Sequence, residues 1–429
     1  MERIAVIGSG IAGLAAAREL TRGPAGCRVT LFEAGAHFGG HANTVDVTLD
    51  DMTHGVDTGF LVYNERTYPQ LVRLFAELGV ESAASEMSFS VQVRSRRLEW
   101  SGNDLAGVFA QRGNLLRPAF WRMLAEIARF NRLATGIAQR AEPAALGQTI
   151  GAFLDGHRFS REFREWYFLP MIACIWSCPS QQMLAFPVAT LIRFCHNHGL
   201  LQVTDRPQWL TVRGGSREYV RRIVAGLDDA RLRTPVLGVK RGEAGALIRT
   251  ASGVEHFDQV VFACHADQAL RLLGADATHA EAQVLGAIRY HPNRAVLHTD
   301  ASVLPRKRSA WAAWNYESAA AGHEAGVCLH YLLNRLQPLP WVRPVIMSLN
   351  PVREPRAESV IRCFDYDHPV FDLGAMAAQR RLPDIQGARR TWYCGAWVGY
   401  GFHEDGLSAG QAVAAALAQA SRVDQRGAA

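Results

Sequence analysis

The sequence predicts an α/β protein in which a Rossmann-like βαβ domain is joined to an α+β domain that contains a helical cap. Three observations predict this fold class. A glycine-rich turn joins an apolar strand to a helix near the N-terminus, and a strand, a glycine loop and a helix follow one another near the C-terminus. A mainly helical stretch lies between these two regions. The 429 residues suffice for two or three domains.

Composition and charge exclude several classes of protein. Hydrophobic residues make up 48% and charged residues 20% of the chain, which excludes a disordered or fibrous protein. The net charge of +6 is too dilute to indicate nucleic acid binding. The 8 cysteines form no Cys-x-x-Cys pair, which favours free thiols and no bound metal. The N-terminus leaves no room for a signal peptide, so we expect a cytoplasmic protein.

The N-terminal element is the motif Gly8-Ser9-Gly10-Ile11-Ala12-Gly13, which follows a short apolar strand and precedes good helix formers. Gly8 permits a tight turn, Gly10 lets the backbone approach a pyrophosphate, and Gly13 lets the helix pack closely on the strand. The helix N-terminus presents free N–H groups to the phosphates. Glu33, which ends a second apolar strand, is placed to accept ribose hydroxyls. The motif therefore predicts a dinucleotide site.

NAD and FAD both fit this motif, and two further segments favour FAD. Gly39-Gly40-His41 follows the second strand in a loop placed to cross the same pyrophosphate. Near the C-terminus, residues 391–397 predict a strand, and residues 399–406 form a glycine-rich loop before an alanine-rich helix. FAD is long enough to reach this second helix start, which would stabilise negative charge on a reduced flavin. The chain has only one GxGxxG motif, so we expect electrons to pass to oxygen or another acceptor.

These segments resemble the flavin-containing amine oxidases and phytoene-desaturase-type oxidoreductases along the whole chain. Within that superfamily, the sequence resembles most a bacterial group of FAD-binding proteins that is linked with the synthesis of cyclopropane-type and other modified fatty acids. The segments that carry the resemblance are Gly8–Gly13, Glu33, Gly39-Gly40, Asp57–Gly59, Pro235-Val236, Asp258–Ala263 and Gly395–Gly410, with Trp176–Pro179, Asp205–Trp209 and Tyr400–Gly406 for the bacterial group.

The resemblance implies a discontinuous FAD-binding domain of the glutathione-reductase type. It would comprise residues 1–75, 205–280 and 380–429, and the substrate or cap domain would comprise residues 76–204 and 281–379.

The resemblance also implies which residues hold the FAD, without a covalent bond. Two positions depart from the superfamily, because His41 replaces an arginine on the pyrophosphate and Ala396 replaces an acidic residue. The implied cofactor-binding residues are Gly8, Gly10, Ile11, Gly13, Glu33, Gly40, His41, Gly59, Phe60, Val236, Gly395, Phe402, His403 and Leu407.

Three residues are candidates for the chemistry at the flavin. Alignment with the superfamily puts Arg294 where many amine oxidases carry a lysine that positions water at flavin N5. Arginine cannot act as a base, but it can bind an anionic group or the flavin; a purely structural arginine is the alternative. Tyr63 is the candidate for proton handling, with simple packing as its alternative. His403 would present a backbone N–H to flavin O2.

We therefore expect an FAD-dependent oxidoreductase that transfers a hydride from a substrate C–H bond to flavin N5. An unsaturated or modified fatty acyl chain is the expected substrate. Oxidation of a small amine or amino acid is one alternative, and an FAD-bound accessory protein or isomerase is another. Most of the aromatic residues of the middle region belong to the core, and some should line an apolar tunnel: Trp176, Phe186, Phe194, Trp209, Trp311 and Trp314.

Residues 112–140 carry six arginines among apolar side chains and a tryptophan, with Glu126 as the only acid. Such a basic amphipathic stretch can lie on an anionic membrane, which would place the protein peripherally on the inner face. A solvated helix face, or two helices split near Pro118, explains the same pattern. The sequence favours the solvated face, and an exposed apolar face would favour the membrane.

Overall fold

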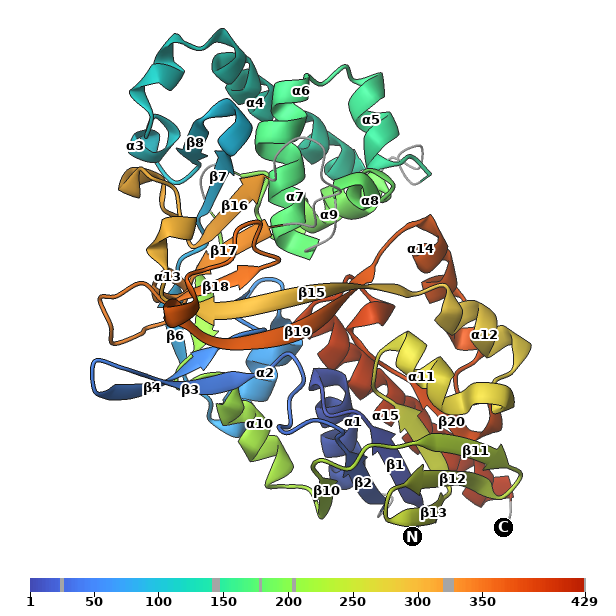
Figure 1. The fold of residues 1–429 in the computed structure, drawn as a ribbon. Helices are drawn as coiled ribbons and strands as arrows, with labels where there is room; N and C mark the ends of the chain where they lie inside the picture. The colour runs from blue at the N-terminus through green and yellow to red at the C-terminus, as the bar shows by residue number, and fades with distance from the viewer. Residues whose placement is uncertain (24–26, 141–146, 177–179, 203–205, 319–327, 428–429) are drawn as a thin grey trace.

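The computed structural model describes residues 1–429 except 24–26, 141–146, 177–179, 203–205, 319–327 and 428–429. Ser177–Pro179 and Asp205, which belong to the segments shared with the bacterial group, lie outside the described residues. Both chain termini lie at one end of the molecule, a helical lobe lies at the other, and a long sheet lies between them (Figure 1).

A five-stranded sheet forms the end of the molecule near the termini. Its order is β10-β2-β1-β14-β20, and every neighbouring pair is parallel. Strands from three distant parts of the sequence thus meet in one sheet, which confirms the predicted fold class. The strands are β1 (Arg3–Ile7), β2 (Arg28–Phe32), β10 (Asp229–Arg231), β14 (Gln259–Phe262) and β20 (Thr391–Tyr393).

Helices α1 (Ile11–Arg22) and α15 (His403–Gly427) cover one face of this sheet. Ile4 and Val6 of β1 face them in a shared core. The two helices approach closely, because a Cβ on Gly410 would lie 2.1 Å from the carbonyl oxygen of Ala12. This contact brings the two ends of the chain together.

The opposite face of the same sheet is covered by a second layer. Ala5 and Ile7, which alternate with the residues that face the helices, pack into this second core. The covering elements are β11 (Gly238–Gly242), β12 (Gly245–Thr250), β13 (Gly253–Phe257), α11 (Ala266–Leu273) and α12 (His279–Gly286).

A seven-stranded sheet runs through the middle of the molecule in the order β19-β15-β18-β17-β16-β7-β8. All of its pairs are antiparallel except β16 with β7. The strands are β7 (Phe89–Val93), β8 (Leu98–Ser101), β15 (Arg289–His298), β16 (Trp314–Ser318), β17 (Cys328–Leu332), β18 (Ile346–Leu349) and β19 (Val360–Val370).

The helical lobe lies beyond β7 and β8 (Figure 1). Phe130 packs against the rings of Phe153, Phe163 and Phe168 in its core. Its helices are α3 (Leu105–Val108), α4 (Pro118–Arg140), α5 (Ile150–Gly156), α6 (Arg161–Phe163), a π-helical turn (Arg164–Phe168), α7 (Leu169–Trp176), α8 (Ser180–Leu184) and α9 (Val188–Asn197), with a 3₁₀ turn at Arg112–Leu116. The predicted interruption at Pro118 separates this turn from α4.

Smaller elements connect the two sheets. The buried carboxylate of Asp57, at the end of β4, accepts hydrogen bonds from the backbone N–H of Ser216 at 2.9 Å and from its hydroxyl at 2.7 Å. Within the described part of the chain, no helix has the length and apolar character that crossing a bilayer requires. The connecting elements are β3 (Thr44–Leu49), β4 (Met52–Asp57), β5 (Tyr63–Asn64), α2 (Pro69–Leu78), β6 (Ser82–Ser85), β9 (Trp209–Val212), α10 (Arg217–Val224), α13 (Leu333–Leu336) and α14 (Leu373–Arg380).

Candidate active site

The glycine turn after β1 leaves a bare concave surface at the start of α1. Gly8 has φ +104°, and a Cβ on Gly13 would lie 1.9 Å from the carbonyl oxygen of Gly8. Gly10 differs, because no atom lies within 4 Å of the place where its Cβ would be. Gly10 is also the N-cap of α1 and provides no side-chain cap. The free N–H groups of the first turn therefore face open space, as an anion site requires.

The loop after β2 closes over this turn. Gly39 forms a bridge with Gly10, and its N–H donates to the carbonyl of Ser9 at 3.0 Å. A Cβ on Gly40 would lie 3.2 Å from Cα of Gly10. Glu33 accepts a hydrogen bond from the N–H of Ser9 at 3.1 Å, which fixes its carboxylate beside the glycine turn.

The C-terminal glycine loop is shaped by Asp405. Its carboxylate accepts hydrogen bonds from the N–H groups of Tyr400 at 3.1 Å and Phe402 at 2.9 Å. Burial raises the pKa of Asp405 to about 6. Gly401 supplies the positive φ, +89°, that this loop needs. The side chains of Phe402 and His403 point into the same cavity as the N-terminal turn.

His403 joins the two ends of the chain. Its imidazole stacks on the ring of Phe60 with the ring centroids 3.8 Å apart, and its Nε2 pairs with the hydroxyl of Tyr219 at 2.6 Å. Burial lowers the pKa of His403 to about 3, so the ring is neutral. The next residue, Glu404, accepts hydrogen bonds from the N–H groups of Gln70 and Leu71 at the start of α2.

A cavity of about 1020 Å³ connects these pieces. It lies at the upper end of the size range of ligand sites, which is about 300–1,000 Å³. One end is lined by both glycine loops, and the other end runs into the helical lobe. The lobe residues that line it are mainly apolar, including Met87, Phe89, Trp100, Val108, Leu124, Ile127, Tyr167, Met171, Ile175 and Leu200.

Polar groups are few at the lobe end of the cavity. Of the lining residues between 87 and 209 that the structure describes, only Arg206 carries a charge. His198 donates from Nδ1 to the carbonyl oxygen of Phe194 at 3.0 Å, so its Nε2 bears no proton when the ring is neutral. Burial lowers the pKa of His198 to about 4, which keeps it neutral. The carboxylate of Asp367 lies instead at the glycine-loop end, where it opposes the effect of burial on the pKa of His265.

A group of histidines lines the glycine-loop end. Nε2 of His41 is buried and has no hydrogen-bond partner among the described residues. The ring centroid of His41 lies 5.4 Å from that of His368. Burial and the neighbouring histidines hold the pKa of His41 well below its usual value. His41 lines the cavity beside the open glycine turn, and a buried polar atom without a partner at this place fits the phosphates of the predicted dinucleotide.

The structure brings together most of the predicted cofactor-binding residues. Two of them do not line the cavity, because Gly13 packs against Gly8 and Leu407 is buried in the core between α1 and α15. Those that line it are Gly8, Gly10, Ile11, Glu33, Gly40, His41, Gly59, Phe60, Val236, Gly395, Phe402 and His403.

Two of the three predicted catalytic side chains lie elsewhere. Tyr63 is buried in the core under α2, where its hydroxyl bonds to that of Ser82 and its ring packs edge-on against Phe75. Packing was the alternative for this residue, and the neighbouring Tyr68 lines the cavity instead.

The side chain of Arg294 also lies away from the cavity. Its guanidinium pairs with Glu354 at 2.7 Å and is 47% exposed. Arg294 lies on β15, where successive side chains face opposite ways, and Ala295 is the residue that lines the cavity. An alignment displaced by a single residue therefore selects the wrong face of the strand.

The aromatic surface of the cap divides between cavity and core. Phe186 and Trp311 lie in hydrophobic clusters, whereas the other four predicted aromatic residues line the cavity. Phe402 stacks on Phe194 with centroids 4.7 Å apart, and Phe194 stacks on His198 at 3.9 Å. The four-residue spacing of Phe194 and His198 at the end of α9 is the sequence signal for this stack.

One cluster in the described part of the chain has metal-ligating side chains: Glu317, Cys328 and His330. It is buried in the seven-stranded sheet, away from the cavity. Nε2 of His330 pairs with Glu317 at 3.0 Å, its Nδ1 bonds to the hydroxyl of Ser348 at 2.7 Å, and Arg94 pairs with Glu317. Because its members are already paired with one another, the cluster forms an internal polar network.

Comparisons with known proteins extend this description. Residues 11–303 match the family described as flavin containing amine oxidoreductase. No curated protein sequence matches the chain. Among solved structures, a putative protoporphyrinogen oxidase from Exiguobacterium sp. 255-15 is similar, with a TM-score of 0.68 and 17% identity over 97% of this chain and 99% of that one.

Two other similar structures differ in what their names say they act on. A fatty acid isomerase from P. acnes that produces CLA has a TM-score of 0.69 and 14% identity, over 97% of this chain and 98% of that one. A cyclohexylamine oxidase from Brevibacterium oxydans IH-35A has a TM-score of 0.68 and 17% identity, over 98% and 99%. At these identities the likeness shows the fold alone.

Proposed function

This chain belongs to the flavin-containing amine oxidoreductase family and is an FAD-dependent oxidoreductase, and we propose that it oxidises an unsaturated or modified fatty acyl chain. The observation that carries the choice of substrate is the long apolar end of the cavity. An acyl chain would fill this end of the cavity and displace its water, which favours binding by the hydrophobic effect.

The cofactor end would be formed by the two glycine loops. The N–H groups at the start of α1 and Nε2 of His41 would face the pyrophosphate, and Glu33 would face a ribose. When bound, FAD supplies the two-electron acceptor, at N5, for the hydride of the substrate. We propose non-covalent binding, because Cys394 is buried in the core and burial raises the pKa of its thiol.

A desaturation removes a hydride from one carbon and a proton from its neighbour. We propose that Nε2 of His198 accepts this proton. The atom is unprotonated because Nδ1 donates to Phe194, and the ring lies against Phe402 with centroids 5.8 Å apart. Phe402 and Phe194 would position the chain and exclude water around it.

The amine alternative is less favoured by the charges. Binding a protonated amine calls for a carboxylate, and the described lining residues between 87 and 209 contain none. The accessory-protein alternative expects a cofactor walled off from any second cavity, whereas the two ends are continuous here. An isomerase would use the same apolar cavity, so it is the second candidate.

For the domains, we propose the division expected from the sequence, with residues 76–204 and 281–379 around the substrate.

The experiment is anaerobic reduction of the purified FAD-loaded enzyme. One series would contain free fatty acids and phospholipids with saturated, unsaturated and cyclopropane-containing chains, and a second would contain small amines and amino acids. We expect acyl compounds to bleach the flavin absorbance and to yield products lighter by two hydrogen atoms in mass spectrometry. Bleaching by amines alone would contradict the proposal, and an acyl product of unchanged mass would identify the isomerase.

A further inference from the structure

The end of the helical lobe exposes large apolar side chains to solvent. Leu116 is 88% exposed, Leu105 77%, Trp121 48% and Leu115 47%. Trp121 donates from its indole N–H to the carbonyl of Leu115 at 2.9 Å, which places the indole beside residue 115. We call residues 105–122, which include α3 and the start of α4, the lobe tip (Figure 1). Clustered exposure of this kind marks an interaction surface.

The lobe tip is also basic. Arg112 and Arg122 are exposed on it, and Arg117 is half-buried. A second basic run, Arg306–Arg308, is exposed beside α3, because α3 packs against the 3₁₀ turn that begins at Arg308. Two nearby acids have internal roles, because Asp104 caps α3 by accepting from the N–H of Gly107 at 2.6 Å and Glu126 accepts from the N–H of Ser160. A third, Glu162, lies 4.0 Å from the guanidinium of Arg122, which remains 58% exposed.

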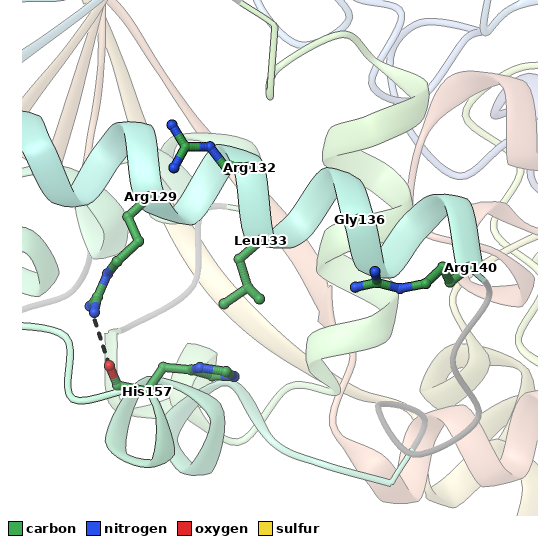
Figure 2. A pocket seen from close by; sticks show the side chains of 6 residues that line it. All are labelled: Arg129, Arg132, Leu133, Gly136, Arg140 and His157. Carbon is green, nitrogen blue, oxygen red and sulfur yellow. Dashed lines mark hydrogen bonds between the residues drawn. The ribbon is translucent and has the colours of Figure 1, made fainter.

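The positive surface continues along α4. A hollow of about 560 Å³ on this helix is lined by Arg129, Arg132, Leu133 and Arg140. In Figure 2, Arg129 and Leu133 point toward His157, whose carbonyl oxygen accepts a hydrogen bond from Arg129, and Arg132 points to the other side of the helix. Among the described residues that line the hollow, none is acidic. Exposed apolar side chains on a surface that also carries arginines match the interfacial region of an anionic bilayer, where the apolar groups enter the acyl boundary and the cations meet phosphates.

The cavity of the active site reaches the lobe tip. Leu124, Ile127 and Asn131 line the cavity, and Trp121 lies one turn before Leu124 on the same stripe of α4. Gly102 and Asn103 are exposed and also line the cavity. One face of a single helix therefore leads from the exposed tip into the cavity.

We propose that the lobe tip docks on an anionic phospholipid bilayer. Leu115, Leu116 and Trp121 enter the interface, and the arginines meet the lipid phosphates. Docking itself does not depend on the proposed reaction. Delivery of an acyl chain from the membrane directly into the cavity would deepen the proposed function. Only this delivery rests on the proposed function.

The test is sedimentation of the FAD-loaded protein with vesicles of phosphatidylcholine alone or with added phosphatidylglycerol. We expect binding to the anionic vesicles that weakens as salt is raised. The double variant Leu115→Glu/Leu116→Glu should bind at least about tenfold more weakly than the parent, because apolar burial and charge attraction are both lost. The matched control is Val342→Glu, a fully exposed apolar residue away from the tip, which should bind like the parent.

A second pair of variants tests the charges. Arg112→Gln/Arg117→Gln should weaken binding to anionic vesicles, whereas Arg28→Gln/Arg249→Gln, at exposed positions on the opposite lobe, should not. Equal binding of tip and control variants would overturn the proposal, as would equal binding to neutral and anionic vesicles. Loss of a dimer in the tip variant, in sedimentation without lipid, would assign the surface to a second copy. Vesicle binding needs no turnover, so failure of the proposed oxidation leaves this test intact.

Discussion

The imidazole of His403 lies flat on the ring of Phe60, with the ring centroids 3.8 Å apart and the planes 13° apart. Phe60 follows the first nucleotide-binding unit, and His403 is the first residue of the last helix. Their contact closes a wall of the cavity from the two ends of the chain. We propose that these two ends close around one molecule of FAD.

His41 predicts a pH-dependent affinity for FAD. In the free protein its ring is neutral, since burial and neighbouring histidines hold its pKa well below the usual value. A pyrophosphate at its unpartnered Nε2 would raise this pKa, so binding takes up a proton and affinity increases as pH falls. Fluorescence titration should show tighter binding at pH 6 than at pH 8, by at most about tenfold per pH unit. His41→Arg, which carries a permanent charge, should flatten this dependence, and His256→Arg should preserve it. Equal affinity at both pH values would contradict the role of His41.

His198→Phe should slow anaerobic flavin reduction by about 100-fold or more if Nε2 accepts the substrate proton. FAD content should be unchanged, and His196→Phe on the same helix serves as the control, because His196 does not line the cavity. With its pKa lowered to about 4, His198 is deprotonated throughout the neutral range, so the rate should stay level between about pH 5 and 8. A rate that falls as pH drops below 6.5, or an active His198→Phe, would remove the residue from the mechanism.

Ile127→Trp should shorten the acyl chain that the enzyme accepts. Ile127 lines the lobe end of the cavity, whereas Ala128, the next residue of α4, is exposed. A tryptophan at 127 fills space that a long chain would occupy, so KM for long chains should rise about tenfold or more while short chains are unaffected. Ala128→Trp should leave every KM unchanged. A uniform effect on all chain lengths would indicate that the acyl chain does not reach this end.

Arg241→Met tests a buried ion pair that joins the second layer to the parallel sheet. Arg241 contacts Glu281 and Asp276, and Glu281 also accepts from the hydroxyl of Tyr393. Removing the cation leaves a buried carboxylate, so the free energy of unfolding in urea should fall by about 3–5 kcal/mol. Arg289→Met, which removes an exposed pair, should change it by about 1 kcal/mol or less.

The same pair has a predictable pH dependence. The pKa of Glu281 is lowered to about 2 in the folded state, where its bonds to Arg241 and Tyr393 outweigh the cost of burial. A lowered folded-state pKa stabilises above the unfolded value, and the effect is lost as pH falls through the folded one. The stability gap between the parent and Arg241→Met should therefore shrink below about pH 4.5. A gap that stays the same there would assign the effect to packing, which does not depend on pH.

The sequence predicted the cofactor end of the site because its signals are local. The spacing of Gly8, Gly10 and Gly13 fixes a turn, and the turn fixes where a phosphate can lie, with no need to know the rest of the fold. The end of one strand at Glu33 and the start of the last helix near His403 are also indicated by residues close to them in the sequence. These residues meet because parallel strands end at one edge of the sheet.

The substrate end could not be predicted in the same way. Arg294 and Ala295 are neighbours, and only the pairing of β15 with β18 and β19 decides which of them faces the cavity. Tyr63 and Tyr68 are similarly close in sequence, and tertiary packing buries one and leaves the other at the cavity. Composition indicated apolar and aromatic residues in the cap, but which of them line a tunnel depends on how distant helices pack.

The most direct test is the FAD content of the purified protein and of Gly10→Val. A Cβ at Gly10 would meet no atom within 4 Å, so we expect the variant to fold with the melting temperature of the parent apoprotein, yet its side chain would occupy the place of the pyrophosphate. A Cβ at Gly242 would also meet no atom within 4 Å, and Gly242 lies away from the cavity, so Gly242→Val is the control. We predict about one FAD per chain in the parent and in Gly242→Val, and a folded, colourless Gly10→Val. A parent protein that takes up no FAD, or a Gly10→Val that binds it equally well, would contradict the account.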